Sequence, residues 1–264
     1  MRANIAGIEI GYDEAGAGER TLVLLHAFPL NRQQWRGQLD DLPARAHLRV
    51  IAPDLRGFGE SAFETGPATI EQWAGDVLAL LDTLHVERFV LAGASMGGYV
   101  AFELLRRAPR RVERVILIDT RATPDTAEGR QAREETARFV EQNDATALFD
   151  REAPKLFSHM TQQERPEIVT AARRIAGLNT PIGLAAAARG LGLRPDSTGD
   201  LPAIACPALV LVGEQDTIAP VADARLLFER IPDARMEILT DAGHLANLEQ
   251  PERFNRVVAE WLTN

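Results

Sequence analysis

The chain is poor in cysteine, in long apolar runs and in positive charge. Its single cysteine, Cys206, cannot form a disulfide within the chain, and its position before Pro207 at the start of an apolar run indicates a small core residue. Because no run reaches about 18 apolar residues, we expect no transmembrane helix. Residues 1–12 lack the apolar stretch and the small-residue cleavage site of a secretory signal, so the sequence predicts a cytoplasmic protein.

The scarcity of positive charge and of clustered metal ligands argues against further classes of function. With 29 lysines and arginines against 38 aspartates and glutamates, the net charge is −9, which argues against a nucleic-acid-binding surface. The five histidines lie far apart in the sequence, and no glycine-rich dinucleotide motif follows a predicted strand. We therefore expect no metal, no organic cofactor, and no nucleic-acid or membrane partner.

What the sequence does contain is the pattern of a parallel sheet covered by helices. Continuous apolar runs are typical of strands buried on both faces, and their alternation with helical stretches predicts an α/β fold. In such sheets, ligands bind beyond the carboxyl ends of the strands. The predicted strands are 8–12 at one edge, then 21–26, 48–52, 89–92, 112–118, 208–212 and 236–239.

The alternation stops between residues 121 and 199, where no clear strand pattern occurs. This stretch is rich in alanine, arginine and glutamate, and prolines divide it into helical segments. We interpret residues 121–199 as a helical cap over the active site, inserted into a core formed by residues 1–120 and 200–264. The predicted cap helices are 126–141, 145–157, 162–177 and 181–191.

The glycine-rich segment 93–98 predicts a sharp turn with Ser95 at its apex, between the strand 89–92 and a helical stretch at 99–108. A turn this tight strains the serine backbone, and side chains at the two flanking glycine positions would collide across it. The hydroxyl is then exposed beside the first N–H groups of the helix. Since those groups have no partner within the helix, they can stabilise an oxyanion. Alone, the motif also fits a glycine-rich loop before an ordinary helix.

A serine hydroxyl is a weak nucleophile at neutral pH, so Ser95 needs a base and a carboxylate that orients the base. Asp216 and His244 follow the last two predicted strands, which places them at the same edge of the sheet as Ser95. Asp119, at the end of strand 112–118, is the rival of Asp216 for the acid. We expect His26 to be structural and to hold the loop that follows it.

The serine, acid and histidine occur in the chain order of the α/β-hydrolase family, and the sequence resembles that family over essentially its whole length. The matching motifs are 26–29, 54–61, 93–98, 213–216 and 243–244. The resemblance is closest to small carboxylesterases, 3-oxoadipate enol-lactonase-like hydrolases and cofactor-free perhydrolases. It implies an α/β-hydrolase fold: a mostly parallel eight-stranded sheet flanked by helices, with a helical cap inserted after the sixth strand.

The resemblance also implies roles for five residues. Ser95 would be the nucleophile, His244 the general base and acid, and Asp216 the carboxylate that orients the histidine. The backbone N–H groups of Phe28 and Met96 would form the oxyanion hole, in a loop where position 27 is alanine and the family usually has glycine. The implied reaction is hydrolysis of a small carboxylic ester or lactone through an acyl-enzyme, with no cofactor or metal.

The same residues fit other functions. Carbon–carbon bond hydrolases of ring-cleavage products share the triad, and perhydrolases share the loop at 28–29. An enol-lactone substrate carries a free carboxylate, for which Arg121 or another cap arginine is a plausible anchor. Non-catalytic ligand receptors also occur on this fold and can keep the triad. The cap residues that are candidates to line the pocket, each with an equally plausible core or solvent-facing role, are Arg121, Phe157, His159 and Met160.

Overall fold

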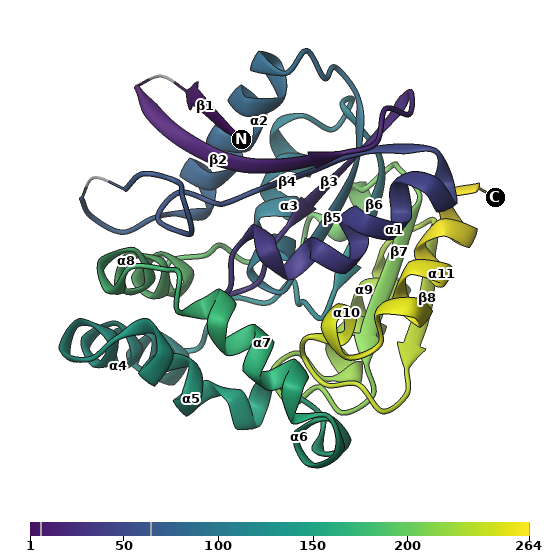
Figure 1. The fold of residues 1–264 in the computed structure, drawn as a ribbon. Coiled ribbons are helices and arrows are strands. Elements are labelled where there is room, and N and C mark those ends of the chain that lie inside the picture. The colour runs from purple at the N-terminus through teal and green to yellow at the C-terminus, as the bar shows by residue number, and fades with distance from the viewer. Residues whose placement is uncertain (6, 64, 264) are drawn as a thin grey trace.

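A computed structural model describes residues 1–5, 7–63 and 65–263 of the protein. A central sheet carries helices on both of its faces, and a separate group of helices lies beside one end of the sheet, at the lower left of Figure 1. The two parts correspond to the predicted sheet core and to the predicted helical insertion.

Among the described residues, eight strands form the sheet: β1 (Arg2–Ile5), β2 (Ile8–Ala15), β3 (Arg20–Leu25), β4 (Leu48–Pro53), β5 (Phe89–Ala94), β6 (Val112–Ile118), β7 (Ala208–Gly213) and β8 (Ala234–Leu239). Their order across the sheet is β1-β2-β4-β3-β5-β6-β7-β8. β2 runs antiparallel to both of its neighbours, and all other neighbouring pairs are parallel. The prediction of a mostly parallel eight-stranded sheet is confirmed.

The predicted edge strand 8–12 does not lie at the edge. β1 pairs antiparallel with it, from Arg2 opposite Gly11 to Ile5 opposite Ile8. β2 also continues to Ala15 alongside β4. The four residues of β1 are too few to show a periodicity, so this strand forms through its pairing and was not predictable from an apolar pattern.

The sheet is buried on both faces, as its continuous apolar strands predict. In β3, Leu22 and Leu24 pack into one buried cluster, whereas Val23 and Leu25 pack into the cluster on the opposite face. Helices α2 (Ile70–Thr83), α3 (Met96–Arg107) and α9 (Val221–Arg230) cover the second face, and α1 (Arg36–Ala46) and α11 (Pro251–Thr263) cover the first.

Short helical turns complete the core. The helix that follows β3 begins as a 3-10 turn, η1 (Arg32–Trp35), before continuing as α1. Asn31 caps it by accepting a hydrogen bond from the Gln33 N–H at 3.0 Å. The other short helices are η2 (Leu201–Ala203), before β7, and α10 (Ala246–Glu249), before α11.

Between β6 and β7 the described chain forms α-helices and no strand: α4 (Ala127–Gln142), α5 (Ala145–Leu156), α6 (His159–Glu164), α7 (Pro166–Ala176) and α8 (Pro181–Gly192). The insertion therefore follows the sixth strand, as predicted. The helix predicted at 162–177 is instead two helices, because Pro166 lacks an N–H and its ring disfavours a helical backbone at Arg165. Across the described residues, every helix is too short or too polar to span a lipid bilayer.

Candidate active site

Ser95 stands at the turn between β5 and α3, with φ 48° and ψ −106°. This is a strained backbone conformation for a residue with a side chain. A Cβ atom at Gly93 would overlap the Gly97 carbonyl, and one at Gly97 would overlap the Leu25 carbonyl. The predicted collision across the turn is therefore confirmed at Gly93, whereas Gly97 is required by the neighbouring strand β3. The close approach of Gly97 to Leu25 also brings the loop after β3 beside the serine.

The side chains of Ser95, His244 and Asp216 form a continuous hydrogen-bonded chain. His244 follows β8, and its Nε2 lies 2.8 Å from the Ser95 hydroxyl oxygen. Its Nδ1 lies 2.8 Å from Oδ2 of Asp216, which follows β7. A carboxylate can only accept, so Nδ1 carries the proton and Nε2 is left to accept the serine proton. All three residues are buried.

The two candidate acids have different partners. The other oxygen of Asp216 accepts the backbone N–H groups of Ile218 and Ala219, at 2.8 and 2.9 Å, which fixes the carboxylate facing His244. Asp119 instead accepts the N–H groups of Gly213 at 2.8 Å and Ala246 at 3.3 Å. Burial, together with the nearby charge of Asp216, raises the pKa of Asp119 well above its usual range. Asp119 therefore braces the loops that carry Asp216 and His244.

The predicted oxyanion donors, Phe28 and Met96, both border the cavity above Ser95. Neither backbone N–H has a hydrogen-bond partner within residues 1–5, 7–63 and 65–263. Met96 is the first residue of α3, where N–H groups have no acceptor inside the helix. The alanine at position 27 is accommodated: it is fully buried, and its N–H donates to Oε1 of Gln34 at 2.8 Å.

His26 has the structural role that the sequence predicts. Its Nε2 accepts the Leu55 N–H at 3.0 Å, so Nδ1 carries the proton and donates to the Ala27 carbonyl at 3.1 Å. Its ring also meets that of Phe58 edge-on, with 4.8 Å between centroids. Burial lowers the pKa of His26 to about 4, so the ring is neutral at pH 7. His26 thus ties the oxyanion loop to the segment 54–61.

A cavity of about 250 Å³ lies above Ser95, between the sheet core and the cap helices. Within the described part of the chain, no group of three or more His, Cys, Asp or Glu side chains is arranged to hold a metal ion. The residues that line the cavity are Phe28, Pro29, Ser95, Met96, Tyr99, Asp125, Gly129, Ala132, Arg133, Thr136, Glu152, Lys155, Leu156, Leu191, Ile218 and His244.

The cap residues proposed from the sequence do not border this cavity. Arg121 forms an ion pair with Asp223 at 3.4 Å. Phe157 is buried against Phe149, with 6.2 Å between ring centroids, and His159 is exposed to solvent. The expectation for these side chains, and for Met160, is therefore corrected, because none of them borders the cavity that contains Ser95. Arg121 is paired with α9 of the core, and Phe157 packs inside the cap.

The cap residues that do border the cavity share a helix face. In α4 they occupy positions i, i+3, i+4 and i+7, and in α5 positions i, i+3 and i+4, which is the spacing of one helical stripe. This spacing was visible in the sequence, but nothing in it indicated which stripe faces the site. The α4 residues are Gly129, Ala132, Arg133 and Thr136, and the α5 residues are Glu152, Lys155 and Leu156.

Asp125 anchors two arginines beside the cavity. Arg133 Nε lies 3.1 Å and Arg194 Nη1 lies 2.7 Å from its two oxygens. Burial would raise the pKa of Asp125, but these two positive charges outweigh burial and hold the pKa below its usual value. The group carries one surplus positive charge. The Nη atoms of Arg133 have no partner among the residues that the structure describes, so they remain able to donate.

A second group with the same charge lies on α5. Glu152 pairs with Arg151 at 2.9 Å and with Lys155, the single lysine of the chain, at 3.4 Å. Glu152 and Lys155 both border the cavity. Of these charged side chains, Arg133, Lys155, Asp125 and Glu152 border the cavity, so two positive and two negative charges face each other in its cap wall.

A mostly parallel eight-stranded sheet with a helical insertion after the sixth strand, and a serine at the turn after the fifth, defines the α/β-hydrolase class. The chain belongs to the alpha/beta hydrolase fold family, whose family model matches residues 20–251.

Individual relatives agree with this assignment. The chain is 31% identical to 3-oxoadipate enol-lactonase 2 of Acinetobacter baylyi over 95% of its own length and 92% of that protein. Among solved structures, it is similar to a thermophilic esterase from Thermogutta terrifontis, with 40% identity, a TM-score of 0.95, and coverage of 100% of this chain and 98% of that one. It is also similar to the enol-lactonase of Burkholderia xenovorans LB400, with 32% identity, a TM-score of 0.92 and full coverage of both chains.

Proposed function

We propose that this protein is a serine hydrolase that cleaves a small carboxylic ester or lactone through an acyl-enzyme. The observation that carries the proposal is the unbroken chain from Ser95 through His244 to Asp216, with 2.8 Å at each step. Membership of the α/β-hydrolase family, with esterases and enol-lactonases among the similar proteins, supports an ester bond as the target.

In the first step, Ser95 Oγ attacks the substrate carbonyl while His244 Nε2 takes the serine proton. The oxyanion that forms is stabilised by the N–H groups of Phe28 and Met96, which have no protein partner in the described residues. His244 then gives its proton to the leaving alkoxide, the carbon–oxygen bond breaks, and the acyl group stays on Ser95.

In the second step, His244 removes a proton from water, and the hydroxide attacks the acyl carbon. The same two N–H groups hold the second oxyanion. Its collapse releases the carboxylic acid and returns the proton to Ser95. Asp216 keeps the proton on Nδ1 of His244 throughout, and its own position is fixed by two backbone N–H groups. This chemistry uses the side chains and backbone of the protein alone.

We also propose that residues 121–199 act as a cap that shapes the substrate cavity, on a core formed by residues 1–120 and 200–264. The cavity walls support this division, because one side comes from the strand ends of the core and the other from α4, α5 and α8.

The Arg133 donors at the cavity favour a more specific candidate, a substrate with an anionic group remote from the scissile bond. Arg133 and Lys155 border the cavity, and the Arg133 Nη donors are free among the described residues. Arginine N–H groups bind carboxylates and phosphates through strong charge-assisted hydrogen bonds. An enol-lactone or a monoester of a dicarboxylic acid has this form, which agrees with the enol-lactonases among the similar proteins.

The experiment that tests the proposal is the hydrolysis of p-nitrophenyl acetate by the wild-type protein, Ser95→Ala and a control, Ser197→Ala. Ser197 is also a buried serine, but it contacts Arg106, away from the cavity. We expect Ser95→Ala to lose about 10⁴-fold or more in kcat/KM, because both the nucleophile and the acyl-enzyme are lost. Ser197→Ala should keep its turnover. Undiminished turnover by Ser95→Ala would rule out the proposed nucleophile. A wild-type protein that binds esters, lactones and ring-cleavage products without turning them over would instead indicate a ligand receptor.

A further inference from the structure

One buried cap side chain, Asn179, touches the loop that carries the proposed oxyanion donor Phe28. Asn179 lies between α7 and α8, and it is 4% exposed although Leu178 and Thr180 on either side of it are exposed. A polar side chain buried between two exposed neighbours costs free energy unless it is hydrogen-bonded. Its partners therefore indicate its role.

Asn179 bonds to two separate loops of the core. Its Nδ2 donates to the Pro29 carbonyl at 2.7 Å, and its Oδ1 accepts the Gly59 N–H at 2.7 Å. Oδ1 also accepts a hydrogen bond from Nδ2 of Asn31 at 3.3 Å. A carbonyl can only accept and a backbone N–H can only donate, so these partners fix which end of the amide faces which loop. An aspartate of the same shape could keep the contact with Gly59 but not, when ionised, the contact with Pro29.

The contact with Pro29 completes the support of the oxyanion loop. On the N-terminal side of Phe28, Ala27 is held by Gln34 and by His26. On the C-terminal side, Pro29 is held by Asn179. The Phe28 N–H therefore lies between two anchored residues, the first secured from the core and the second from the cap.

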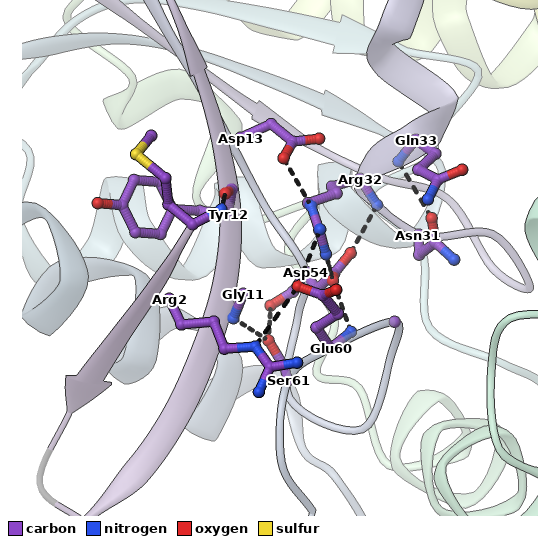
Figure 2. Close-up of polar contacts among 12 residues, drawn as sticks. Arg2, Gly11, Tyr12, Asp13, Asn31, Arg32, Gln33, Asp54, Glu60 and Ser61 are labelled. Carbon is purple, nitrogen blue, oxygen red and sulfur yellow. Dashed lines mark hydrogen bonds and ion pairs between the residues drawn. The ribbon is translucent and has the colours of Figure 1, made fainter.

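The second loop bound by Asn179 is itself rigid. The Asp54 carboxylate accepts the backbone N–H groups of Arg32 and Glu60, both at 2.8 Å, and pairs with the Arg32 guanidinium. Figure 2 shows this carboxylate between Arg32 and Glu60, with Ser61 donating to the Asp54 carbonyl at 2.7 Å. Because Gly59 belongs to this braced segment, its N–H gives the Asn179 amide a fixed point of attachment.

We propose that Asn179 is a positioning residue through which the cap holds the oxyanion hole in its working geometry. The proposal rests on the proposed function, because it takes the Phe28 N–H as an oxyanion donor. When the Asn179 contact is lost, Pro29 is released, the Phe28 N–H moves from its position, and stabilisation of the transition state weakens. Substrate binding changes less than transition-state stabilisation, because Asn179 does not border the cavity itself and acts only through Phe28 and Pro29 in its wall.

The test compares Asn179→Ala, Asn179→Asp and a matched control, Asn143→Ala. Asn143 is an exposed cap asparagine whose Nδ2 donates to the Phe139 carbonyl within the cap. Two readouts are taken: kcat and KM for p-nitrophenyl acetate, and the affinity of a trifluoromethyl ketone, to which Ser95 adds to form an oxyanion in the hole. Removal of an oxyanion donor costs about 10²- to 10³-fold in kcat, so displacement of one should cost roughly 10- to 100-fold.

In each Asn179 variant, we expect kcat and the affinity for the trifluoromethyl ketone to fall by the same factor as each other. KM should change by less than about threefold. Asn143→Ala should match the wild-type protein. The aspartate variant has nearly the shape of asparagine, so it carries the test if the alanine variant does not fold. Wild-type kcat in Asn179→Asp, or a loss of kcat without a matching loss of ketone affinity, would overturn the positioning role.

The outcomes also separate this proposal from the one on which it rests. If the Asn179 variants keep wild-type kcat and ketone affinity while Ser95→Ala is inactive, only the positioning role is overturned. An active Ser95→Ala would overturn the proposed function itself, whatever the Asn179 variants do.

Discussion

The core and the cap both border the cavity, but they reach it in different ways. Ser95, Asp216 and His244 follow three different strands, and the parallel sheet brings those strand ends to one edge. The cap residues come from helix faces whose direction depends on how the helices pack on one another, as α4 packs along α8. Residues at strand ends were therefore predictable from the sequence, whereas cap residues that face the cavity were not.

The largest expected effect is in the core, where we compare the activities of variants of its two buried acids, Asp216 and Asp119. We expect Asp216→Asn to lower kcat/KM for p-nitrophenyl acetate by about 10⁴-fold, because an amide no longer holds His244 in the required tautomer. Asp119→Asn should cost less than about tenfold. It leaves one of two backbone N–H groups without its acceptor, which should lower the free energy of unfolding by about 1–3 kcal/mol.

The two variants are measured side by side, by steady-state kinetics and by urea unfolding. The opposite ranking, with Asp119→Asn nearly inactive and Asp216→Asn active, would identify Asp119 as the acid. It would contradict the assignment of Asp216 from its hydrogen bond to His244.

A second effect concerns the stability of the core and its dependence on pH. The pKa of His26 is about 4 in the folded protein and 6.5 ordinarily, so between these values the unfolded chain binds the extra proton. Stability from this group is therefore full above about pH 6.5 and is lost as the pH falls toward 4, by roughly 3 kcal/mol in total. His26→Gln, which can still accept the Leu55 N–H, should lack this loss.

Urea unfolding of the wild-type protein and of His26→Gln, at pH 7 and pH 4.5, measures the difference directly. If the free energy of unfolding falls by the same amount in both proteins between pH 7 and pH 4.5, His26 is not buried in its neutral form.

The smallest effect is expected in the cap, and it is selective for the substrate. Arg133→Gln should raise KM for the monoester p-nitrophenyl succinate about tenfold, since a charge-assisted hydrogen bond to the free carboxylate is lost. KM for the neutral p-nitrophenyl acetate should stay within about twofold. His159→Ala serves as the matched cap control, because His159 lies outside the cavity. A selective loss in His159→Ala, or equal losses for both esters in Arg133→Gln, would contradict the positions given by the structure.

The sequence was sufficient for seven of the eight strands, for the insertion after the sixth strand and for the convergence of Ser95, Asp216 and His244. Strand ends and sterically required glycines can be recognised in short stretches of sequence. A parallel sheet then brings the strand ends together at one edge, where the site forms. The sequence was not sufficient for β1, which forms through pairing with β2, or for the break before Pro166. Nor did it indicate Asn179, whose importance depends on two loops more than 100 positions away.

The central claim is that Ser95 is the nucleophile, and covalent labelling tests it most directly. The protein is treated with a fluorophosphonate, which reacts with activated serines, digested, and analysed by mass spectrometry in the wild-type, Ser95→Ala and His244→Ala forms. We expect one adduct per wild-type chain, on the peptide that contains Ser95, appearing in step with the loss of esterase activity. We expect none in either variant on the same time scale. An adduct on a different serine, or full esterase activity in a chain labelled at Ser95, would contradict the claim.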